Sequence, residues 1–365
     1  MARVTLEGLS KSFGADVAVH GLDLAMPAGA FCALLGPSGC GKTTTLRMIA
    51  GLERPSGGRV LFDGADMGDV PPRRRDVGMV FQRYALFPHM SVRDNVGFGP
   101  SVRGLPRLER ESRVDAMLEV VRLSELGHRF PAQLSGGQMQ RVAIARTLVT
   151  EPRVLLMDEP LANLDTGLRA EMRGFIRDLQ RRLGLTTILV THDQTEAMEL
   201  ADHVAVMLDG RLAQWGTPER LYAAPASLAV ARFLGARNVL AGRIVEGDRV
   251  MLPLGTLAVA PGHGLAAGTA VHAVLREEAL DVLTGDGSGG DGTLAGRIAA
   301  RTFHGATVSY EIEAARGGPA ARVIVTEPAR RSLDIGTAVR LQVAPERVHL
   351  IEGDGTPPHL EDSTP

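Results

Sequence analysis

The chain has 365 residues, a length that predicts two domains or three small ones, and its 44% hydrophobic content with only 4% aromatic residues predicts aliphatic cores. A formal net charge of −2 gives no basic footprint for nucleic acid, and no apolar run reaches the ~20 residues of a membrane span. The two cysteines, Cys32 and Cys40, are too close together to indicate a disulfide framework. These features favour a reducing, cytoplasmic compartment, and the N-terminus lacks the apolar core of a signal peptide.

Short strand-like runs broken by glycine and proline fill residues 3–35 and predict an antiparallel edge that leads into a buried strand, Phe31 to Leu35. Phe13 lies in a turn of this region. Two interpretations of Phe13 stay open at this point. Its ring is either a core aromatic group or a platform that stacks on a nucleotide base.

A glycine-rich turn follows the buried strand, and Thr44 to Ala50 has the pattern of a helix after it. The turn is Gly36-Pro37-Ser38-Gly39-Cys40-Gly41-Lys42-Thr43. Between a strand and a helix, this pattern predicts a phosphate-binding loop, in which backbone N–H groups and the helix N-terminus face an anion. Lys42 is expected to reach the β- and γ-phosphates, and the Thr43 hydroxyl to bind a magnesium ion.

The composition argues against a glycine turn that binds no ligand. Only two of the 40 basic residues are lysines, Lys11 and Lys42. A chain that otherwise uses arginine places a lysine here, where a compact ammonium group fits between phosphate oxygens. The nucleotide interpretation is therefore favoured.

Residues 51–82 alternate turns with short strands and end in the apolar run Val77 to Phe81, directly before Gln82. Gln82 alone is an ordinary polar residue at a strand end. The segment Tyr84 to Pro88 is unusually apolar for a connection and predicts a partner contact if it is exposed. From about Ser91 to Leu126, apolar residues recur at three- and four-residue spacing, which predicts helix.

A second glycine pair precedes an amphipathic helix expected at Met139 to Val149. It lies in Ser135-Gly136-Gly137-Gln138. Ser135 is a good N-cap and the glycines expose backbone N–H groups, so this helix N-terminus can hold an anion. An ordinary capped helix is the alternative, because one nucleotide rarely needs two such sites in one chain.

Two adjacent carboxylates follow the apolar run Val154 to Met157, which has the pattern of a strand buried on both faces. Parallel α/β sheets bind ligands at the C-terminal ends of such strands. Asp158 is placed to hold magnesium through water, and Glu159 to orient or deprotonate an attacking water. A solvated acidic turn is the less favoured alternative.

The turn Leu161 to Asp165 precedes an amphipathic helix expected at Leu168 to Leu183. A buried strand is expected at Thr187 to Val190, and His192 lies at its end. A single histidine is more often structural than catalytic. This one is level with Asp158 at the strand ends, where it can contact a γ-phosphate.

After about residue 235 the sequence becomes glycine-rich and strand-like, and it contains an internal repeat. Leu240 to Ile244 recurs as Leu294 to Ile298, and Gly268 to Val271 recurs as Gly336 to Val339. The second copy carries about 14 extra residues, expected between Phe303 and Thr326. Two duplicated β-units of this length predict one small barrel-like domain.

Together these motifs resemble the ATP-binding subunits of ABC transporters, and most closely the importer group that includes the maltose, polyamine, ferric-iron and sulfate/molybdate ATPases. The motifs occur in the order GPSGCGKTT, VFQ, LSGGQ, VLLMDEP, LANLD and THD, followed by the duplicated β-domain. LSGGQ before the acidic pair, with a histidine after the next strand, is highly specific. The resemblance covers nearly the whole chain.

The resemblance implies an α/β fold for residues 1–235, a P-loop NTPase core of the ABC ATPase type with a helical subdomain at about 84–150. It implies an all-β, OB-like regulatory domain of the TOBE type over residues 236–352. The stretch Thr284 to Thr293 between the two copies is expected to be a flexible linker or a long hairpin loop, and residues 353–365 a disordered tail.

By this resemblance the chain binds ATP and Mg²⁺. The loop from Gly36 through Thr44 would hold the nucleotide, and Phe13 would stack on adenine. Gln82 would contact magnesium beside Thr43 and Asp158, and would relay the nucleotide state. Glu159 would be the general base and His192 the γ-phosphate contact.

The resemblance also implies a homodimer. In such ATPases two subunits meet head to tail, and each ATP lies between the phosphate loop of one subunit and the LSGGQ segment of the other. Ser135, Gly137 and Gln138, with Gly136 between them, would therefore act in trans on the partner's γ-phosphate. Asp165 would belong to a loop that crosses the dimer interface.

Further implied partners are two transmembrane permease subunits, which residues 84–88 would face, and, indirectly, an extracytoplasmic solute-binding protein; no nucleic acid is implied. The chain would lie peripherally on the cytoplasmic side of the bacterial inner membrane. The cargo stays open between polyamine, ferric iron, an inorganic oxyanion and a sugar.

Two rival functions are weighed against transport. An ABC-type ATPase acting on nucleic acid or ribosomes usually carries two cassettes or a long coiled-coil insertion, and a phosphate-loop kinase has no role for LSGGQ. Ala162, where serine is usual, and Met139, where glutamine is usual, depart from the common pattern of the transporter family. Neither is expected to touch a reacting group, although Ala162 is expected to weaken one interface hydrogen bond.

Overall fold

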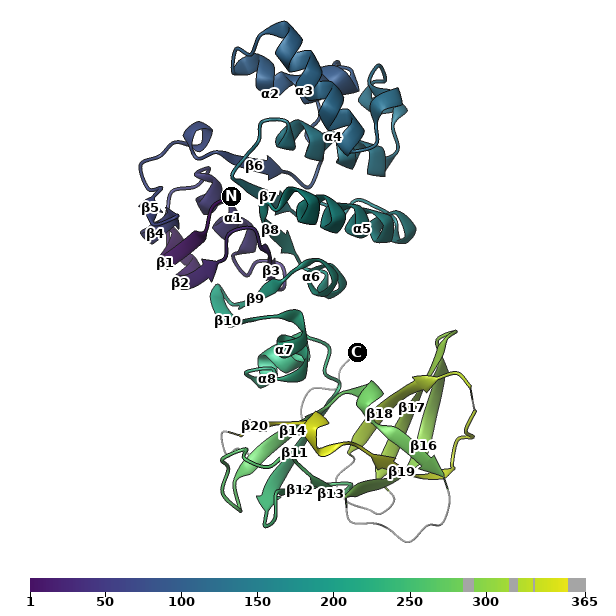
Figure 1. Cartoon of the computed structure of the whole chain (residues 1–365). Helices are drawn as coiled ribbons and strands as arrows, with labels where there is room; N and C mark the ends of the chain where they lie inside the picture. The colour runs from purple at the N-terminus through teal and green to yellow at the C-terminus, as the bar shows by residue number, and fades with distance from the viewer. Residues whose placement is uncertain (285–291, 315–320, 331, 354–365) are drawn as a thin grey trace. The chain divides into compact units, whose positions relative to one another are not determined.

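The structure is a computed structural model and describes residues 1–284, 292–314, 321–330 and 332–353. The chain divides into two compact units, Met1–Leu221 and Tyr222–Pro365 (Figure 1). The linker expected at residues 284–293 and the tail expected at 353–365 lie mostly outside the described residues. Within the described ranges, no helix combines the length and the apolar character needed to cross a bilayer.

Two sheets form the framework of the first unit. The N-terminal sheet is antiparallel, with the order β2-β1-β4-β5, and its strands are β1 Val4–Phe13, β2 Asp16–Met26, β4 Gly57–Phe62 and β5 Ala65–Asp66. The central sheet has the order β10-β9-β3-β8-β7-β6, and its strands are β3 Phe31–Leu35, β6 Val77–Val80, β7 Val154–Asp158, β8 Thr186–Thr191, β9 His203–Leu208 and β10 Arg211–Gly216. All of these run parallel except β10, which pairs antiparallel at one edge. Every residue of β3 and β8 is buried, as expected for strands covered on both faces.

The helices of the first unit separate into two groups (Figure 1). They are α1 Lys42–Ala50, α2 Val92–Val102, α3 Arg107–Val120, α4 Gly136–Leu148, α5 Thr166–Leu183 and α6 Gln194–Leu200, with short 3₁₀ turns η1 Pro72–Arg74, η2 Ser124–Leu126 and η3 Pro131–Gln133. Helices α1, α5 and α6 accompany the central sheet, whereas α2, α3 and α4 pack together around a separate apolar cluster that includes Val96, Leu118 and Val142. The expected P-loop core with a helical subdomain is confirmed.

At two places the local sequence explains where a helix begins or ends. The helical pattern from Ser91 to Leu126 is divided between α2 and α3, because Gly104 adopts a left-handed φ of +75° and Pro106 precedes the first residue of α3. Helix α4 begins at Gly136, earlier than the expected Met139, because Ser135 caps it.

The second unit is an antiparallel β-domain, so the expected all-β C-terminal domain is confirmed. Helix α7, Pro218–Ala223, spans the division between the units, and α8, Leu228–Phe233, precedes the strands. The strands are β11 Asn238–Val245, β12 Arg249–Leu252, β13 Gly255–Ala258, β14 Ala270–Leu275, β15 Asp281–Thr284, β16 Thr293–Phe303, β17 Thr307–Ala314, β18 Arg322–Pro328, β19 Ala338–Gln342 and β20 Val348–Glu352, with 3₁₀ turns η4 Glu277–Ala279 and η5 Pro345–Arg347. Their order is β15-β19-β16-β13-β12-β11-β14-β20, with β17 pairing β16 and β18 pairing β17.

The strand pairing confirms the repeat seen in the sequence. Strand β11 pairs with β12 and β14, and in the second copy β16 pairs in the same way with β17 and β19. The guanidinium of Arg243 donates to the carbonyl of Gly268, and that of Arg297 donates to the carbonyl of Gly336 at the matching place. Part of the extra length of the second copy lies in β16, β17 and β18, which are longer than their counterparts β11, β12 and β13.

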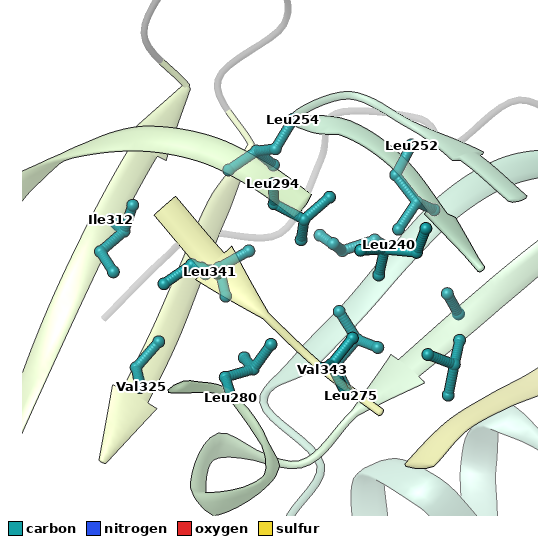
Figure 2. Close-up of a cluster of buried hydrophobic side chains, with 14 of the residues drawn as sticks. Leu240, Leu252, Leu254, Leu275, Leu280, Leu294, Ile312, Val325, Leu341 and Val343 are labelled. Carbon is teal, nitrogen blue, oxygen red and sulfur yellow. The ribbon is translucent and has the colours of Figure 1, made fainter. Parts of the chain in front are cut away.

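The two copies exchange their last strands. Strand β15, from the first copy, pairs with β19 of the second, and β20, from the second, pairs with β14 of the first. Apolar side chains from both copies then share one core (Figure 2). The labelled members are Leu240, Leu252, Leu254, Leu275, Leu280, Leu294, Ile312, Val325, Leu341 and Val343. Neither copy therefore forms a complete folding unit by itself.

Candidate active site

The glycine-rich loop lies between β3 and α1, as its sequence predicts. A Cβ atom at Gly36 would lie 2.2 Å from the carbonyl oxygen of Met207, so no larger residue fits there. Gly41 has a φ of 88°, and a Cβ at this position would lie 2.4 Å from the carbonyl oxygen of Ala18. Close packing requires glycine at both positions. At Gly41 the left-handed backbone conformation is a second reason.

Lys42, the first residue of α1, turns back across the loop. Its side chain is buried, and its Nζ donates to the carbonyl oxygens of Gly36 and Pro37, both at 2.8 Å. The Sγ of Cys40 lies 3.6 Å from the same nitrogen. Burial raises the pKa of the Cys40 thiol and the Lys42 charge opposes that rise. An ammonium group held at a loop of backbone N–H groups is suited to bind a phosphate.

Thr43 and Asp158 meet at the ends of α1 and β7. The Thr43 hydroxyl donates to Asp158 Oδ1 at 3.0 Å. Burial raises the pKa of Asp158, and the hydrogen bond from Thr43 partly offsets that rise. A hydroxyl and a single carboxylate are hard oxygen donors, a set that suits Mg²⁺ when substrate phosphates complete the coordination.

Glu159 lies between two polar side chains from neighbouring strand ends. His192 Nδ1 lies 3.0 Å from Glu159 Oε1, and Gln82 Nε2 donates to Glu159 Oε2 at 3.4 Å. The backbone of Glu159 is left-handed, with φ of 44°, and its N–H donates to the carbonyl of Val190 at 3.0 Å. Because β6, β7 and β8 are neighbours in the central sheet, the structure brings together these three residues from distant parts of the sequence (Figure 1).

Asn163 is a member of this group that the sequence analysis did not single out. Its Nδ2 donates to the backbone carbonyl of Gln82 at 2.7 Å, which fixes the segment after β6. The only sequence signal was its place in the LANLD turn, two residues before Asp165. Asp165 itself caps α5 by accepting from the N–H of Leu168 at 3.0 Å.

The second glycine pair forms a separate helix N-terminus. Ser135 Oγ accepts from the N–H of Gln138 at 3.3 Å, and Gln138 Oε1 accepts from the N–H of Ser135 at 3.0 Å, a complete capping box. A Cβ at Gly137 would lie 2.7 Å from Leu168 Cδ1, so this glycine packs against the start of α5. In the described part of the chain, the capping box makes no hydrogen bond to the phosphate loop.

Phe13 ends β1 and its side chain is 51% exposed, so the core interpretation of this residue is wrong. The Nζ of Lys11 lies 4.9 Å from the centre of the ring. An exposed aromatic ring leaves a face on which a base can stack. Cys32 and Cys40, also in this unit, are both free thiols, in agreement with the sequence analysis.

Comparison with known proteins assigns the chain to a protein family. Residues 19–162 match the ABC transporter family, and residues 273–351 match the TOBE domain. The Fe(3+) ions import ATP-binding protein FbpC of Rhizobium etli is 49% identical over 313 residues, which cover 85% of this chain and 87% of that protein. The chain belongs to the ABC transporter family. It is the ATPase subunit of an ABC importer, in which ATP hydrolysis drives import.

Other ABC transporter proteins support the same assignment. The FbpC protein of Brucella abortus is 44% identical over 343 residues, 93% of this chain and 95% of that protein. The solved structure of cbiO1 from Clostridium perfringens, described as part of the ABC transporter complex cbiONQ, is similar with a TM-score of 0.57 and 35% identity. The matched region covers 60% of this chain and 90% of the cbiO1 chain.

Proposed function

We propose that this ABC transporter subunit hydrolyses Mg-ATP as a homodimer to drive the import of ferric iron. The observation that carries the chemistry is the carboxylate of Glu159, held between His192 and Gln82 next to the Thr43–Asp158 pair. Support for the cargo comes from relatives described as Fe(3+) ions import proteins, at 49% and 44% identity over most of both chains.

In this proposal the loop from Gly36 to Thr44 cradles the phosphates and Lys42 exchanges its loop carbonyls for phosphate oxygens. Phe13 offers its exposed ring to the adenine. Thr43, Asp158 and the side chain of Gln82 hold Mg²⁺, which when bound with ATP neutralises charge on the β- and γ-phosphate oxygens.

The chain's own groups then position and activate a water molecule. Glu159 accepts the proton of the attacking water as the general base, and His192, 3.0 Å from that carboxylate, holds the γ-phosphate. The hydrogen bonds from Gln82 and His192 limit the rotation of the Glu159 side chain. Because phosphoryl transfer needs little covalent chemistry from the protein, this positioning supplies most of the catalysis.

A second copy of the chain completes the site. The capping box of α4 uses the N–H groups of Ser135 and Gln138 and makes no described hydrogen bond to the loop of its own chain. Among the described residues, the N–H groups of Gly136 and Gly137 therefore stay free to face a partner's loop. Ser135, Gly136, Gly137 and Gln138 then contact the partner's γ-phosphate through backbone N–H groups and side chains. Asp165, at the start of α5, lies in the loop that crosses the interface.

Two permease subunits are the proposed membrane partners, on the cytoplasmic side of a bacterial inner membrane, with a solute-binding protein acting on the other side. The apolar segment at residues 84–88 is the proposed contact. Arg146 anchors this segment by donating to the carbonyls of Ala85, at 2.7 Å, and Tyr84, at 3.2 Å. Ala85 and Pro88 are exposed and available to a partner, whereas Leu86 packs against the helical apolar cluster and Phe87 against Phe98.

Glu159→Gln tests the proposed chemistry. Glutamine keeps the shape but cannot accept a proton, so we expect ATP binding within about twofold of the wild type and turnover lowered by at least about 100-fold. The closed, ATP-bound dimer should accumulate and be visible by sedimentation. Glu151→Gln, which changes an exposed carboxylate, is the matched control. Ordinary turnover by Glu159→Gln would remove the role given to this residue.

Uptake in cells tests the cargo. In cells that express the full transporter, Lys42→Ala in this subunit should abolish uptake of ⁵⁵Fe(III) and leave uptake of sulfate, spermidine and maltose unchanged. Unchanged iron uptake together with loss of one of the other three would assign the transporter to that other cargo.

A further inference from the structure

Three arginines on α5 face α6 at four-residue intervals, which places them on one face of the helix. The ion pairs are Arg169 with Asp193 at 3.6 Å, Arg173 with Glu199 at 2.6 Å and Arg177 with Asp202 at 2.5 Å. We call these residues the arginine ladder. Its second pair joins α5 to Glu199 in the last turn of α6, and its third joins α5 to Asp202, two residues after the end of α6.

Arg169 differs from the other two arginines because it contacts two loops. Its Nη2 donates to the backbone carbonyl of Leu164 at 3.1 Å, in the turn that precedes α5. Its Nη1 lies 3.6 Å from Asp193 Oδ2, in the turn that carries His192. Its Nε is buried and has no hydrogen-bond partner among the described residues. One guanidinium therefore spans the turns at residues 161–165 and 191–193.

The turn that carries His192 is tightly fixed on both sides of the histidine. Asp193 Oδ1 accepts from the N–H groups of Thr195 at 2.8 Å and Glu196 at 3.2 Å. Thr191 Oγ1 accepts from the N–H of Asp193 at 3.0 Å and donates to the buried carboxylate of Glu196 at 2.7 Å. His192 stands between two residues that are bonded to each other, so a displacement of Asp193 displaces His192 with it.

We propose that Arg169 is a positioning residue that joins the turn at residues 161–165 to the turn of His192. This inference rests on the proposed function, in which the first turn lies at the dimer interface and His192 holds the γ-phosphate. Docking of a second copy against the interface turn then orders His192 and, through their contact, Glu159. ATP turnover in one subunit thereby depends on the docking of the other subunit against its interface turn.

Arg169→Met tests this role, with Arg173→Met as the matched control one helical turn away. Because the interface turn loses its link to His192, we expect kcat of Arg169→Met to fall roughly tenfold with KM for ATP within about twofold of the wild type. Arg173→Met removes a closer ion pair, so its unfolding temperature should fall at least as far while its kcat stays within about twofold. The single tryptophan, Trp215, reports unfolding of this unit.

The variants His192→Ala and Arg169→Met/His192→Ala test whether Arg169 acts through the histidine. We expect the double variant to turn over as fast as His192→Ala alone. Full kcat in Arg169→Met beside a defective His192→Ala would overturn the inference and leave the proposed function intact. A double variant slower by the product of both effects would also overturn it. Wild-type turnover by His192→Ala would instead remove the proposed role of His192, and this inference with it.

Discussion

Arg75 shows how a single buried cation supports the helix that starts at the phosphate loop. Its guanidinium donates to the carbonyls of Met48 and Ile49, at 2.9 and 3.0 Å, in the last turn of α1. It also donates to the carbonyls of Val70 and Met67, at 2.8 and 2.6 Å. Burial lowers the pKa of Arg75. A cation at a helix C-terminus stabilises the helix dipole, so Arg75 secures the end of α1 opposite the phosphate site.

Arg75→Met should destabilise the first unit. The substitution removes four hydrogen bonds, and although the carbonyls of Met48 and Met67 keep a backbone donor, we expect the free energy of unfolding to fall by about 2–4 kcal/mol. Urea unfolding followed by Trp215 fluorescence measures this change. Arg74→Met, at an exposed neighbour, should stay within about 0.5 kcal/mol of the wild type. Equal stability of the two variants would contradict the capping role.

The sequence could not show this role, because Arg75 stands in a run of three arginines with no pattern that separates them. Burial and hydrogen-bond partners depend on the packing of η1 against α1, which is a tertiary feature. Lys42 and Glu159, by contrast, were assigned from motifs whose residue types and spacing are set by the chemistry of phosphate binding. Lys42, at the start of α1 after the loop that follows β3, and Glu159, directly after β7, lie where the sequence analysis expected them.

Among the elements, α4 and α5 pack where the second glycine pair meets Leu168. The Cβ that alanine would add at Gly137 lies 2.7 Å from Leu168 Cδ1 and 3.2 Å from Leu168 Cγ. This contact lies within one chain, whereas the proposed phosphate contact of Gly137 lies across the dimer. The same glycine therefore carries a packing constraint and a proposed binding role.

Gly137→Ala, alone and combined with Leu168→Ala, tests the packing role of Gly137 separately from its proposed phosphate contact. The clash should lower the free energy of unfolding by about 1–2 kcal/mol, and adding Leu168→Ala should remove that extra cost relative to Leu168→Ala alone. Because the added methyl group points at Leu168 and the backbone N–H is kept, turnover in the double variant should return to the level of Leu168→Ala alone. Turnover that stays well below that level would show that glycine is needed at this position for more than its packing against Leu168.

Most elements of the first unit were predicted because their signals are local. Strand β3 has the expected bounds, and β7, β8 and α5 begin or end within two residues of expectation. The N-terminal strands were expected as an antiparallel edge that leads into the buried strand; they pair antiparallel, as expected, but in a sheet separate from β3. Pairing between strands is set by long-range packing, and the short runs in residues 3–35 carried no signal for it.

In the second unit, one side chain links the two repeat copies. Asn238, buried at the start of β11, donates from Nδ2 to the carbonyl of Ile324 and accepts from the N–H of Ile324, both at 2.7 Å. Asn238→Ala removes both bonds, so we expect the free energy of unfolding of this unit to fall by about 2–4 kcal/mol. Hydrogen exchange at the Ile324 amide should accelerate strongly, and the exposed Gln342→Ala should leave it unchanged. Slow exchange in Asn238→Ala would contradict the link.

Across the whole molecule, the repeat was visible in the sequence but the exchange of β15 and β20 was not. The matching segments identify equivalent positions in the two copies, yet they do not specify which copy each last strand pairs with. The pairing of the last strands is set by the shared core of Figure 2, which leucines and valines from both copies fill together. The family resemblance was therefore the stronger guide to the all-β domain, and the comparisons confirm it.

We propose that one chain holds half of each hydrolytic site of the dimer. In the proposed dimer the phosphate loop, Asp158 and Glu159 come from one copy, and Ser135 to Gln138 from the other. Ser135→Arg should accordingly bind ATP through its own loop and hydrolyse it poorly. This variant provides the reference for activity without a partner contribution.

The most direct test is ATP turnover per chain as a function of protein concentration, with the oligomeric state followed by sedimentation velocity in the same buffer. We predict that turnover per chain falls to the level of Ser135→Arg at concentrations where the protein sediments as a monomer, and rises as the ATP-bound dimer forms. Full turnover per chain, independent of concentration, in a sample that sediments as a monomer would contradict the account.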